Sequence, residues 1–264
     1  MAYGLNIQDV EKNRKRAELK ATDLGHSALV VDEPEFGLVK MHAEKGKNGL
    51  WHDTNRHGFF YIEEGRVIVR INAGGKKFEI PLGKGEVLKM ERGIRYKLQA
   101  EDESTLYVFL GKYEYHKPQD ELDLSCSDPV VSLSCSDPVV SKTHDFRDKY
   151  WGTIETIVSN HEIAGKRIFL DAKKWKGKWG SLEYHLRKKE AYYVHSGIVQ
   201  AGVRVGRAEN YTIKLSQGES FVIPQGLMHR RGSFENAVII EISTKDDDSD
   251  SNLVANGEKD VCQI

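Results

Sequence analysis

Four side chains in the second half of the chain have the types and spacing of ligands for a single metal ion. They read Glu183-x-His185-(x)4-Glu190, and His229 follows a Pro-x-Gly turn further along. Alternate side chains of a β-strand point to the same face, so Glu183 and His185 would enter one interior. Glu190 would enter across a loop, and His229 from a later strand. Oxygen and nitrogen ligands without thiolate suit one divalent ion (Zn, Mn, Fe, Co or Ni) better than a structural thiolate site.

Cationic, aromatic and acidic side chains surround these candidate ligands in the sequence. Fixed cations beside a metal ion attract an anionic substrate, which favours a sugar or sugar-phosphate ligand. We expect the substrate to contact Arg187, Lys189, Tyr192 and Arg230. A general base is also needed if protons are to move, and the alternative candidates are Lys188, His195 and Glu241.

This spacing resembles the two sequence motifs of the cupin superfamily. The first motif is Gly-(x)5-His-x-His-(x)3,4-Glu-(x)6-Gly, and the second is Gly-(x)5-Pro-x-Gly-(x)2-His-(x)3-Asn. Eight positions match them: Gly177, His185, Glu190 and Gly197, then Gly218, Pro224, Gly226 and His229. Glu183 stands where the first motif has a histidine, and Asn236 comes later than the final asparagine should. The resemblance implies a double-stranded β-helix, or jelly-roll, barrel.

Residues from about 147 to 250 are similar, more specifically, to the cupin domain of type II mannose-6-phosphate isomerases. Ser181-Leu-Glu-Tyr-His185 stands where that family has Ser-Leu-Gln-x-His, and Ile223-Pro-Gln-Gly-Leu-Met-His229-Arg230 resembles its Ile-Pro-x-x-x-x-His-Arg. The family's arginine after its Asp-rich segment has no clear counterpart in residues 245–260. The resemblance implies aldose–ketose isomerisation, in which a metal polarises the sugar oxygens and a base moves a proton through a cis-enediol.

Other functions would use the same residues. His185, Glu190 and His229 would form the two-histidine-one-carboxylate triad of a non-haem iron dioxygenase, although Glu183 would then occupy a position that oxygen needs. A non-enzymatic sugar-binding or regulatory cupin would keep the ligands without turnover. A metal-dependent lyase or epimerase acting on an acidic sugar stays open as well.

The first half of the chain carries a second copy of the pattern without its ligands. Three pairs of glycines, each 132 or 133 positions apart, align the copies: Gly65 and Gly197, Gly85 and Gly218, Gly93 and Gly226. A constant offset over a domain length indicates internal duplication. In this alignment the four ligand positions hold Trp51, Asp53, Gly58 and Tyr96. If the alignment is shifted by one residue, His52 and His57 occupy two of the ligand positions, but the other two positions still hold no ligand.

We therefore predict an all-β protein of two tandem cupin barrels with a short N-terminal helix. The expected segments are a helical segment at 1–22, with 8–22 as the helix, a degenerate barrel at 23–116 and a metal-binding barrel at 147–245. A linker with a nine-residue tandem repeat (124–132 and 133–141) would span 117–146. The acidic tail, 246–264, is either disordered or folded over the site. A hairpin is expected at Gly74-Gly75, and single strands at 193–199, 220–223 and 238–242.

Composition limits the remaining function classes. The formal net charge of the 264 residues is −1, so no bulk field favours nucleic acid or a membrane surface. No segment approaches the roughly 20 apolar residues of a membrane span, and the N-terminus is polar and charged. The three cysteines form no Cys-x-x-Cys pair, which favours free thiols in a reducing cytoplasm. We expect a cytoplasmic homodimer, formed through edge strands, that acts on a small molecule.

Overall fold

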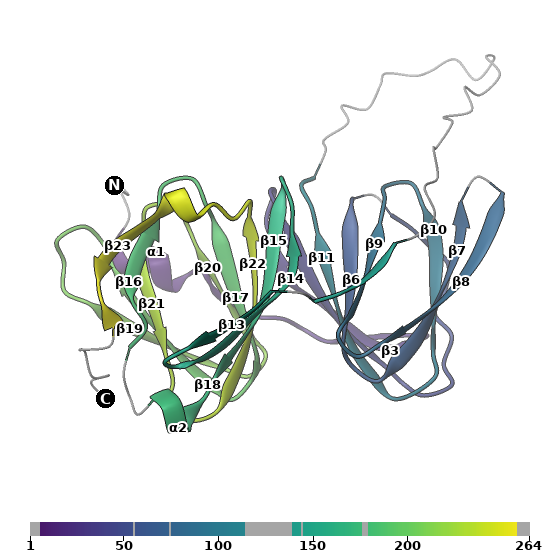
Figure 1. The fold of residues 1–264 in the computed structure, drawn as a ribbon, viewed down its shortest axis with the longest axis horizontal. Coiled ribbons are helices and arrows are strands. Elements are labelled where there is room, and N and C mark those ends of the chain that lie inside the picture. The colour runs from purple at the N-terminus through teal and green to yellow at the C-terminus, as the bar shows by residue number, and fades with distance from the viewer. Residues whose placement is uncertain are drawn as a thin grey trace, which may run out of the picture.

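The structure is a computed structural model that describes residues 6–54, 56–73, 75–113, 139–143, 145–175 and 179–257. Within these residues it consists of two antiparallel β-barrels lying side by side, which confirms the predicted all-β fold of two jelly-roll barrels (Figure 1). All three cysteines, Gly177 and most of the tandem repeat lie outside the described residues. No helix of the described chain is long and apolar enough to cross a membrane.

The N-terminal barrel is formed by two facing sheets. Its strands are β2 (Lys20–Thr22), β3 (Gly25–Asp32), β4 (Gly37–Ala43), β5 (His52–Asp53), β6 (Gly58–Glu64), β7 (Arg66–Ala73), β8 (Lys76–Gly83), β9 (Glu86–Met90), β10 (Arg95–Ala100), β11 (Ser104–Leu110) and β12 (Val140–Lys142). The seven-stranded sheet has the order β12-β9-β6-β11-β4-β3-β2, and the four-stranded sheet has the order β5-β10-β7-β8.

The C-terminal barrel repeats this plan. Its elements are β1 (Arg14–Arg16), β13 (Asp145–Lys149), β14 (Gly152–Ser159), β15 (Ile163–Leu170), α2 (Ala172–Trp175), β16 (Leu182–His185), β17 (Glu190–Ser196), β18 (Ile198–Arg204), β19 (Tyr211–Ser216), β20 (Glu219–Ile223), β21 (Met228–Gly232), β22 (Ala237–Thr244), a 3-10 turn η1 (Asp248–Asp250) and β23 (Ser251–Ala255). The sheet orders are β1-β20-β17-β22-β15-β14-β13 and β19-β18-β21-β16-β23.

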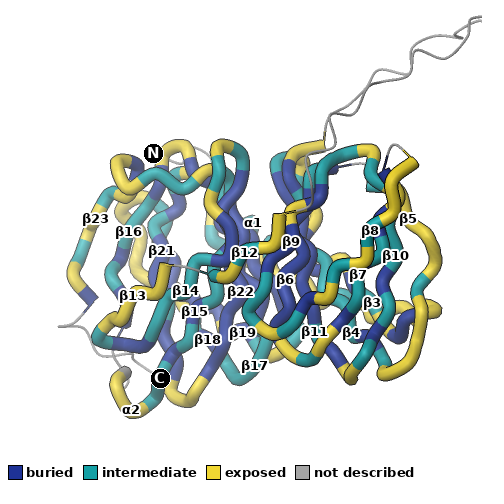
Figure 2. Tube along the Cα trace, turned by 45° about the vertical axis from the view of Figure 1, so that its right-hand side comes forward, coloured by how far each residue is buried: buried dark blue, intermediate teal, exposed yellow. Residues whose placement is uncertain are grey.

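Hydrophobic patterning explains why these segments form strands. In β7 the buried residues Val67, Val69 and Ile71 alternate with more exposed ones, as in a sheet with one face in the core. Strands β6 and β22 are buried on both faces, because one face lines a barrel interior and the other packs against the neighbouring barrel. Figure 2 shows the inner strands as buried, whereas edge strand β13 is exposed along its length.

The turns predicted from glycine are largely where the sequence places them. Strands β7 and β8 pair antiparallel up to Ala73 and Lys76, which confirms the predicted hairpin. The single strand predicted at 193–199 is instead two strands, β17 and β18, separated by Gly197. Gly197 has a φ of 76° and its counterpart Gly65 a φ of 80°, a conformation that residues with a Cβ rarely adopt. The duplication therefore preserves the same turn in both barrels.

The expected N-terminal helix is wrong beyond its first turn. Helix α1 spans only Ile7–Glu11, with the Asn6 side chain capping its start. Residues Arg14–Arg16 form β1, which pairs with β20 at the edge of the C-terminal barrel, and Arg14 forms a 2.7 Å ion pair with Glu219. A segment with so thin an apolar stripe gains more from completing a sheet edge than from continuing as a helix.

Each barrel takes one edge strand from a segment that is separated in sequence from its other strands. Strand β1 begins the chain but joins the C-terminal barrel, and β12 follows the first barrel and the linker but pairs with β9 of the N-terminal barrel. In Figure 1 the purple α1 accordingly lies against the green and yellow C-terminal barrel. The two edges β20 and β9 occupy the same place in the two barrels, so the exchange is reciprocal.

The acidic tail is folded as far as the structure describes it. Strand β23 pairs antiparallel with β16, the strand that carries two predicted metal ligands. We call residues 246–255 the strap. The strap resolves the two alternatives for the tail in favour of a segment packed at the site, and it extends the sheet of the second barrel past the predicted limit at residue 245.

A buried polar interface joins the two barrels. Tyr107 of the first barrel lies with its hydroxyl 2.6 Å from Nδ1 of His195 in the second. Arg167 donates from Nε to both oxygens of Glu63, at 2.9 and 3.0 Å. These polar groups sit among the shared hydrophobic residues that pack between the barrels.

Candidate metal centre

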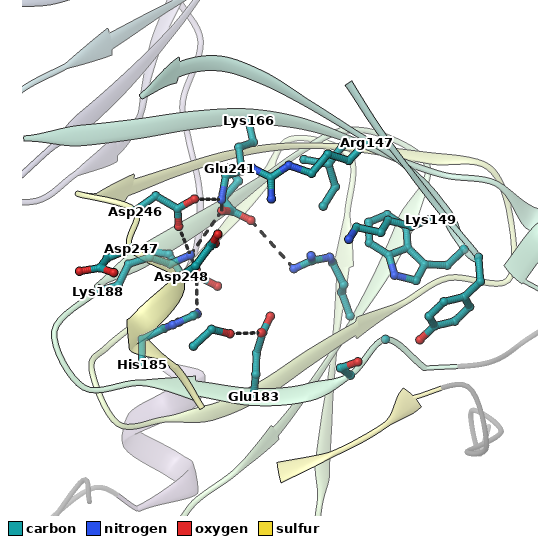
Figure 3. Close-up of a pocket in the computed structure, with 18 residues that line it drawn as sticks. Arg147, Lys149, Lys166, Glu183, His185, Lys188, Glu241, Asp246, Asp247 and Asp248 are labelled. Atoms are coloured by element: carbon teal, nitrogen blue, oxygen red, sulfur yellow. Dashed lines mark hydrogen bonds and ion pairs between the residues drawn. The ribbon is translucent and has the colours of Figure 1, made fainter. Parts of the chain in front are cut away.

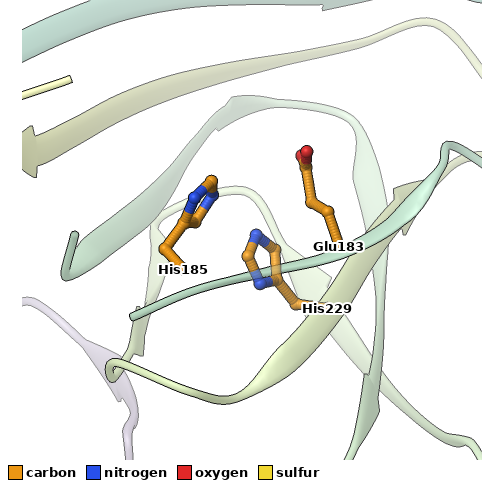
Figure 4. A group of neighbouring side chains, drawn as sticks. All are labelled: Glu183, His185 and His229. Carbon is orange, nitrogen blue, oxygen red and sulfur yellow. The ribbon is translucent and has the colours of Figure 1, made fainter. Parts of the chain in front are cut away.

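Two neighbouring strands of the C-terminal barrel carry three of the predicted ligands. Glu183 and His185 lie on β16, and His229 lies on β21, directly opposite Glu183 in the strand register. One ligand atom from each of these residues lies within 4.8 Å of the others (Figure 4). Alternate positions on β16 face the barrel interior, as the sequence spacing predicts.

The hydrogen bonds of both imidazoles prepare them to bind a metal ion. Nδ1 of His185 lies 3.1 Å from the backbone oxygen of Asp250, and Nδ1 of His229 lies 3.0 Å from that of Leu227. A carbonyl oxygen can only accept, so each Nδ1 carries a proton and Nε2 is the nitrogen left to bind a metal ion. Both Nε2 atoms are buried and have no hydrogen-bond partner among the described residues.

Glu190 completes the group from β17, the next strand in the chain. Its Oε1 lies 2.8 Å from Nε2 of His229 but is not aligned for a hydrogen bond, and its Oε2 lies 3.7 Å from Nε2 of His185. Buried oxygen and nitrogen atoms without partners are costly unless something binds them. Two imidazoles and two carboxylates converging in this way fit a divalent metal ion.

Positive charges keep both carboxylates ionised. Burial alone would raise the pKa of Glu190, but Lys188 and His229 outweigh it and hold that pKa well below the usual value. Burial would likewise raise the pKa of Glu183, yet His229 and Arg231 lower it, helped by a 2.7 Å hydrogen bond from Ser251. Carboxylates that stay ionised are the form that metal ions bind.

A cavity of about 350 Å³ opens beside this group (Figure 3). Glu183, His185 and Glu190 line one part of it, and the aromatic ring of Trp151 lines another. Five cationic side chains also line it: Arg147, Lys149, Lys166, Lys188 and Arg231. Such a cavity has the size and the convergent polar groups of a small-molecule site.

The cations and carboxylates of the cavity form one network. Nζ of Lys188 lies 2.7 Å from Glu190, 3.2 Å from Asp246 and 3.8 Å from Glu241. Glu241 also lies 3.6 Å from Lys166 and 3.9 Å from Arg231. Burial alone would lower the pKa of Lys188, but its three carboxylate neighbours outweigh burial and raise the pKa, so Lys188 remains protonated.

Of the seven other predicted site residues, the cavity includes only Lys188 and Glu241. Arg187 is largely exposed and contacts Asp247. Lys189 forms ion pairs with Glu33 and Glu35 of the first barrel. Tyr192 is buried beneath the site, where its hydroxyl accepts a hydrogen bond from Arg231.

Arg230 and His195 also lie away from the cavity. The guanidinium of Arg230 packs 4.6 Å from the ring centre of Trp179, on the opposite side of β21 from His229. His195 faces Tyr107 in the interface between the barrels. Alternation along the strands accounts for Arg230, because neighbouring residues on a strand point to opposite faces.

Three residues of the network are not among the predicted catalytic and substrate-binding residues. Arg231 is two positions after His229 on β21, so the same alternation would have placed it in the cavity. Lys166 is paired with Glu241 across β15 and β22, a register that the sequence does not display. Asp246 depends on the path of the strap, for which the sequence left two alternatives.

The corresponding positions of the first barrel hold no such group. In the register, His52 pairs with Tyr96 just as Glu183 pairs with His229, so the alignment that placed Trp51 opposite Glu183 is wrong by one residue. His57 does not rescue the site, because it forms a 2.7 Å contact with Glu91 and is partly exposed. Glu183, His185 and His229 are the group of potential metal ligands found in the described residues.

Comparisons with known proteins agree with this architecture. Residues 180–260 match the family model described as Cupin. Solved structures of oxalate decarboxylase from Bacillus subtilis superpose with TM-scores of 0.68 and 0.69, at 16% and 14% sequence identity. The first covers 89% of this chain and 77% of that chain, and concerns the enzyme's Mn(II) centres; the second covers 92% and 78%. No curated protein matches the sequence. The fold is that of a bicupin.

Proposed function

We propose that the C-terminal barrel is a divalent-metal-dependent enzyme that isomerises a small sugar or sugar phosphate. The observation that carries the proposal is the convergence of three buried atoms without hydrogen-bond partners, Nε2 of His185, Nε2 of His229 and Oε1 of Glu190. They face one point beside a cavity large enough for a small molecule. Glu183 supplies a fourth potential ligand from the same side.

The charges of the cavity favour an anionic substrate that carries hydroxyl groups. Most of the cations there are already paired with carboxylates, and such pairs offer both donors and acceptors to sugar hydroxyls. Lys149 is exposed at the cavity, and no carboxylate of the described residues lies within ion-pair distance of it. The resemblance to mannose-6-phosphate isomerases supports the same substrate class.

Glu241 is the residue best placed to move a proton. When bound, a divalent metal supplies Lewis-acid polarisation of carbonyl and hydroxyl oxygens. Glu241 is an acceptor that faces the cavity, so its carboxylate would take a proton from one sugar carbon and return it to the next. Lys188 is committed as a donor to Glu190 and Asp246, and His195 lies outside the cavity, so neither is suited to be the base. Arg231 would stabilise negative charge on the reacting oxygens.

A second candidate function has one observation in its favour. The group formed by Glu183, His185 and His229 contains two imidazoles and one carboxylate, which is the ligand set of non-haem iron oxygenases. Against it stands the fourth group, Glu190, whose oxygen lies 2.8 Å from His229. The two functions differ in the metal that they require and in oxygen consumption.

The test is elemental analysis of the wild-type protein and of a Glu190→Ala, His229→Ala double variant, followed by a screen of sugar phosphates. We expect about one equivalent of Zn, Mn, Co or Ni in the wild type, its loss in the variant, and aldose–ketose turnover that requires the metal. One equivalent of iron with oxygen consumption would support the oxygenase instead. Metal without turnover on any sugar would leave a binding protein, and a wild type that binds no added metal would contradict the enzymatic proposal.

A further inference from the structure

One carboxylate of the strap lies between two ammonium groups of the cavity. Asp246 follows β22, and its Oδ2 lies 2.5 Å from Nζ of Lys166 while its Oδ1 lies 3.2 Å from Nζ of Lys188. The two lysines come from different elements, Lys166 from β15 and Lys188 from the loop after β16 (Figure 3). The Asp246 carboxylate therefore already binds both ammonium groups, one through each of its oxygens.

We propose that the anionic group of the substrate binds between Lys166 and Lys188 in place of the Asp246 carboxylate, so that the strap competes with the substrate. The inference rests on the proposed function, and it specifies the substrate as a small molecule with a terminal carboxylate or phosphate. Both groups offer at least two oxygens that can accept from two ammonium donors at once.

Asp246 is the most replaceable of the carboxylates around Lys188. The side chains of Glu190 and Glu241 are 2% and 4% exposed, whereas that of Asp246 is 20% exposed. Solvent, and therefore a ligand, reaches Asp246 first. Glu190 and Glu241 also lie within central strands, whereas Asp246 lies in the segment between β22 and η1.

The strap does not depend on Asp246 to stay in place. The Asp250 carboxylate accepts hydrogen bonds from the backbone N–H groups of Leu186, Arg187 and Lys188 at 2.8 to 3.0 Å. Strand β23 pairs with β16 just beyond. Because these contacts hold the strap at the last residue of η1 and beyond it, Asp246 can leave the lysines while the rest of the strap remains bound.

Charge balance also favours exchange over simultaneous binding. Three cations, Lys166, Lys188 and Arg231, already balance three carboxylates, Glu190, Glu241 and Asp246. A further anion would add repulsion between like charges in a partly buried site. Replacement of Asp246 by a substrate carboxylate leaves the charge unchanged, and replacement by a phosphate adds at most about one negative charge.

The experiment measures the dissociation constant of inorganic phosphate by calorimetric titration of the purified full-length protein, with acetate titrated in parallel. Asp246→Asn removes the competing charge, and we expect phosphate to bind at least about tenfold more tightly, because the charge-assisted hydrogen bonds of both lysines then become available to the ligand. Lys166→Gln should weaken phosphate binding at least about tenfold. Tighter binding of acetate than phosphate would identify a carboxylate substrate, and the reverse a phosphorylated one.

The matched control is Asp247→Asn, which removes the same charge one position away. Asp247 contacts Arg187 and Ser249 rather than the two lysines, so phosphate affinity should change less than about twofold. Equal gains in Asp246→Asn and Asp247→Asn, or no gain in a folded Asp246→Asn protein, would overturn the inference. Asp246→Ser serves the same purpose if the asparagine variant does not fold.

Metal content, determined on the same samples, separates this inference from the proposed function. Metal binding and isomerase turnover with unchanged phosphate affinity in Asp246→Asn would refute only the competition by the strap. If the wild type contains no metal but the variants change phosphate affinity as expected, the metal enzyme is refuted and an anion-binding site remains.

Discussion

The two barrels share one strand plan but differ in what their interiors contain. The sheets of both follow equivalent orders, and β6, β9 and β11 of the first correspond to β17, β20 and β22 of the second. Where the second barrel has Glu190 and His229, the first has Gly58 and Tyr96. The first barrel keeps a cavity of about 160 Å³ there, walled largely by apolar side chains such as Phe60 and Met90.

This difference separates the requirements of the fold from those of the site. The first barrel closes and packs without buried ligands, so the fold does not need Glu183, His185, Glu190 or His229. Buried charges cost stability unless they are paired, and the second barrel surrounds its carboxylates with Lys166, Lys188 and Arg231. Because these buried charged groups cost folding free energy and the fold does not need them, a role in binding or catalysis explains them best.

The largest expected effect is the loss of metal from one barrel only. His229→Ala removes a candidate ligand whose Nε2 forms no hydrogen bond among the described residues, so metal binding should be lost and turnover should fall by about a thousandfold, or about 4 kcal/mol. His52→Ala, at the position of Glu183 in the first barrel, is the matched control and should leave metal content unchanged. Elemental analysis and turnover on the substrate found in the screen measure both, and equal metal loss in the two variants would break the comparison.

Removal of Glu190 tests how far the second barrel relies on its buried ion pairs for stability. Glu190→Ala leaves the buried ammonium of Lys188 without its nearest carboxylate, so the metal-free protein should lose about 3 kcal/mol of unfolding free energy. Glu190→Gln keeps the shape and one acceptor, and should cost less. Urea denaturation in the presence of a chelator measures both, and an Ala variant as stable as the wild type would show that this ion pair does not matter for folding.

Removal of the metal should loosen the second barrel and spare the first. A bound ion at a hundred times its dissociation constant stabilises the folded protein by about 2.7 kcal/mol, and chelation removes that contribution. Hydrogen exchange should therefore become faster in β16, β21 and β23, which hold or flank the ligands. Their counterparts β5 and β10 should exchange as before. Uniform acceleration in both barrels would indicate that the ion stabilises the whole molecule.

The smallest expected effect concerns the contact between the barrels. Burial lowers the pKa of His195 below its ordinary value of 6.5, so the folded state holds the imidazole neutral. Below about pH 6.5 the unfolded chain takes up a proton that the folded chain does not, and the free energy of unfolding falls as the pH falls. His195→Gln should remove that part of the pH dependence, whereas the exposed His161→Gln should not. Urea denaturation at pH 7.5 and 5.5 gives the comparison, and identical slopes in all three proteins would contradict it.

The fold is predicted well from the sequence, and so is the clustering of the four candidate ligands in one barrel, because both depend on local spacing. The candidate ligands fall within one barrel for reasons that the sequence displays. These are the alternation of side chains on β16, the Pro-x-Gly turn before His229, and the repeated glycines at 65 and 197. The substrate-facing residues were harder to predict. Arg187, Lys189 and Arg230 lie close to the ligands in sequence, but strand alternation and contacts with the first barrel direct them elsewhere.

The residues that replace them come from distant parts of the chain. Lys166 reaches the cavity through the pairing of β15 with β22, and Asp246 reaches it through the path of the strap. The register between distant strands and the path of an acidic tail cannot be predicted from local composition. For the same reason the helix expected at 8–22 ends at Glu11, since the pairing of β1 with β20 joins residues about 200 positions apart.

The reciprocal exchange of edge strands has a consequence for how the chain can be assembled. As the chain emerges during synthesis, the first barrel cannot acquire its last strand until residues 140–142 have appeared, well after its other strands. The segment at 14–16, made among the first, must wait for the second barrel before its backbone groups find partners. Neither half therefore contains all of its own strands. A cut between them would produce two fragments that each carry the missing edge of the other, and reassociation of the pair would restore both.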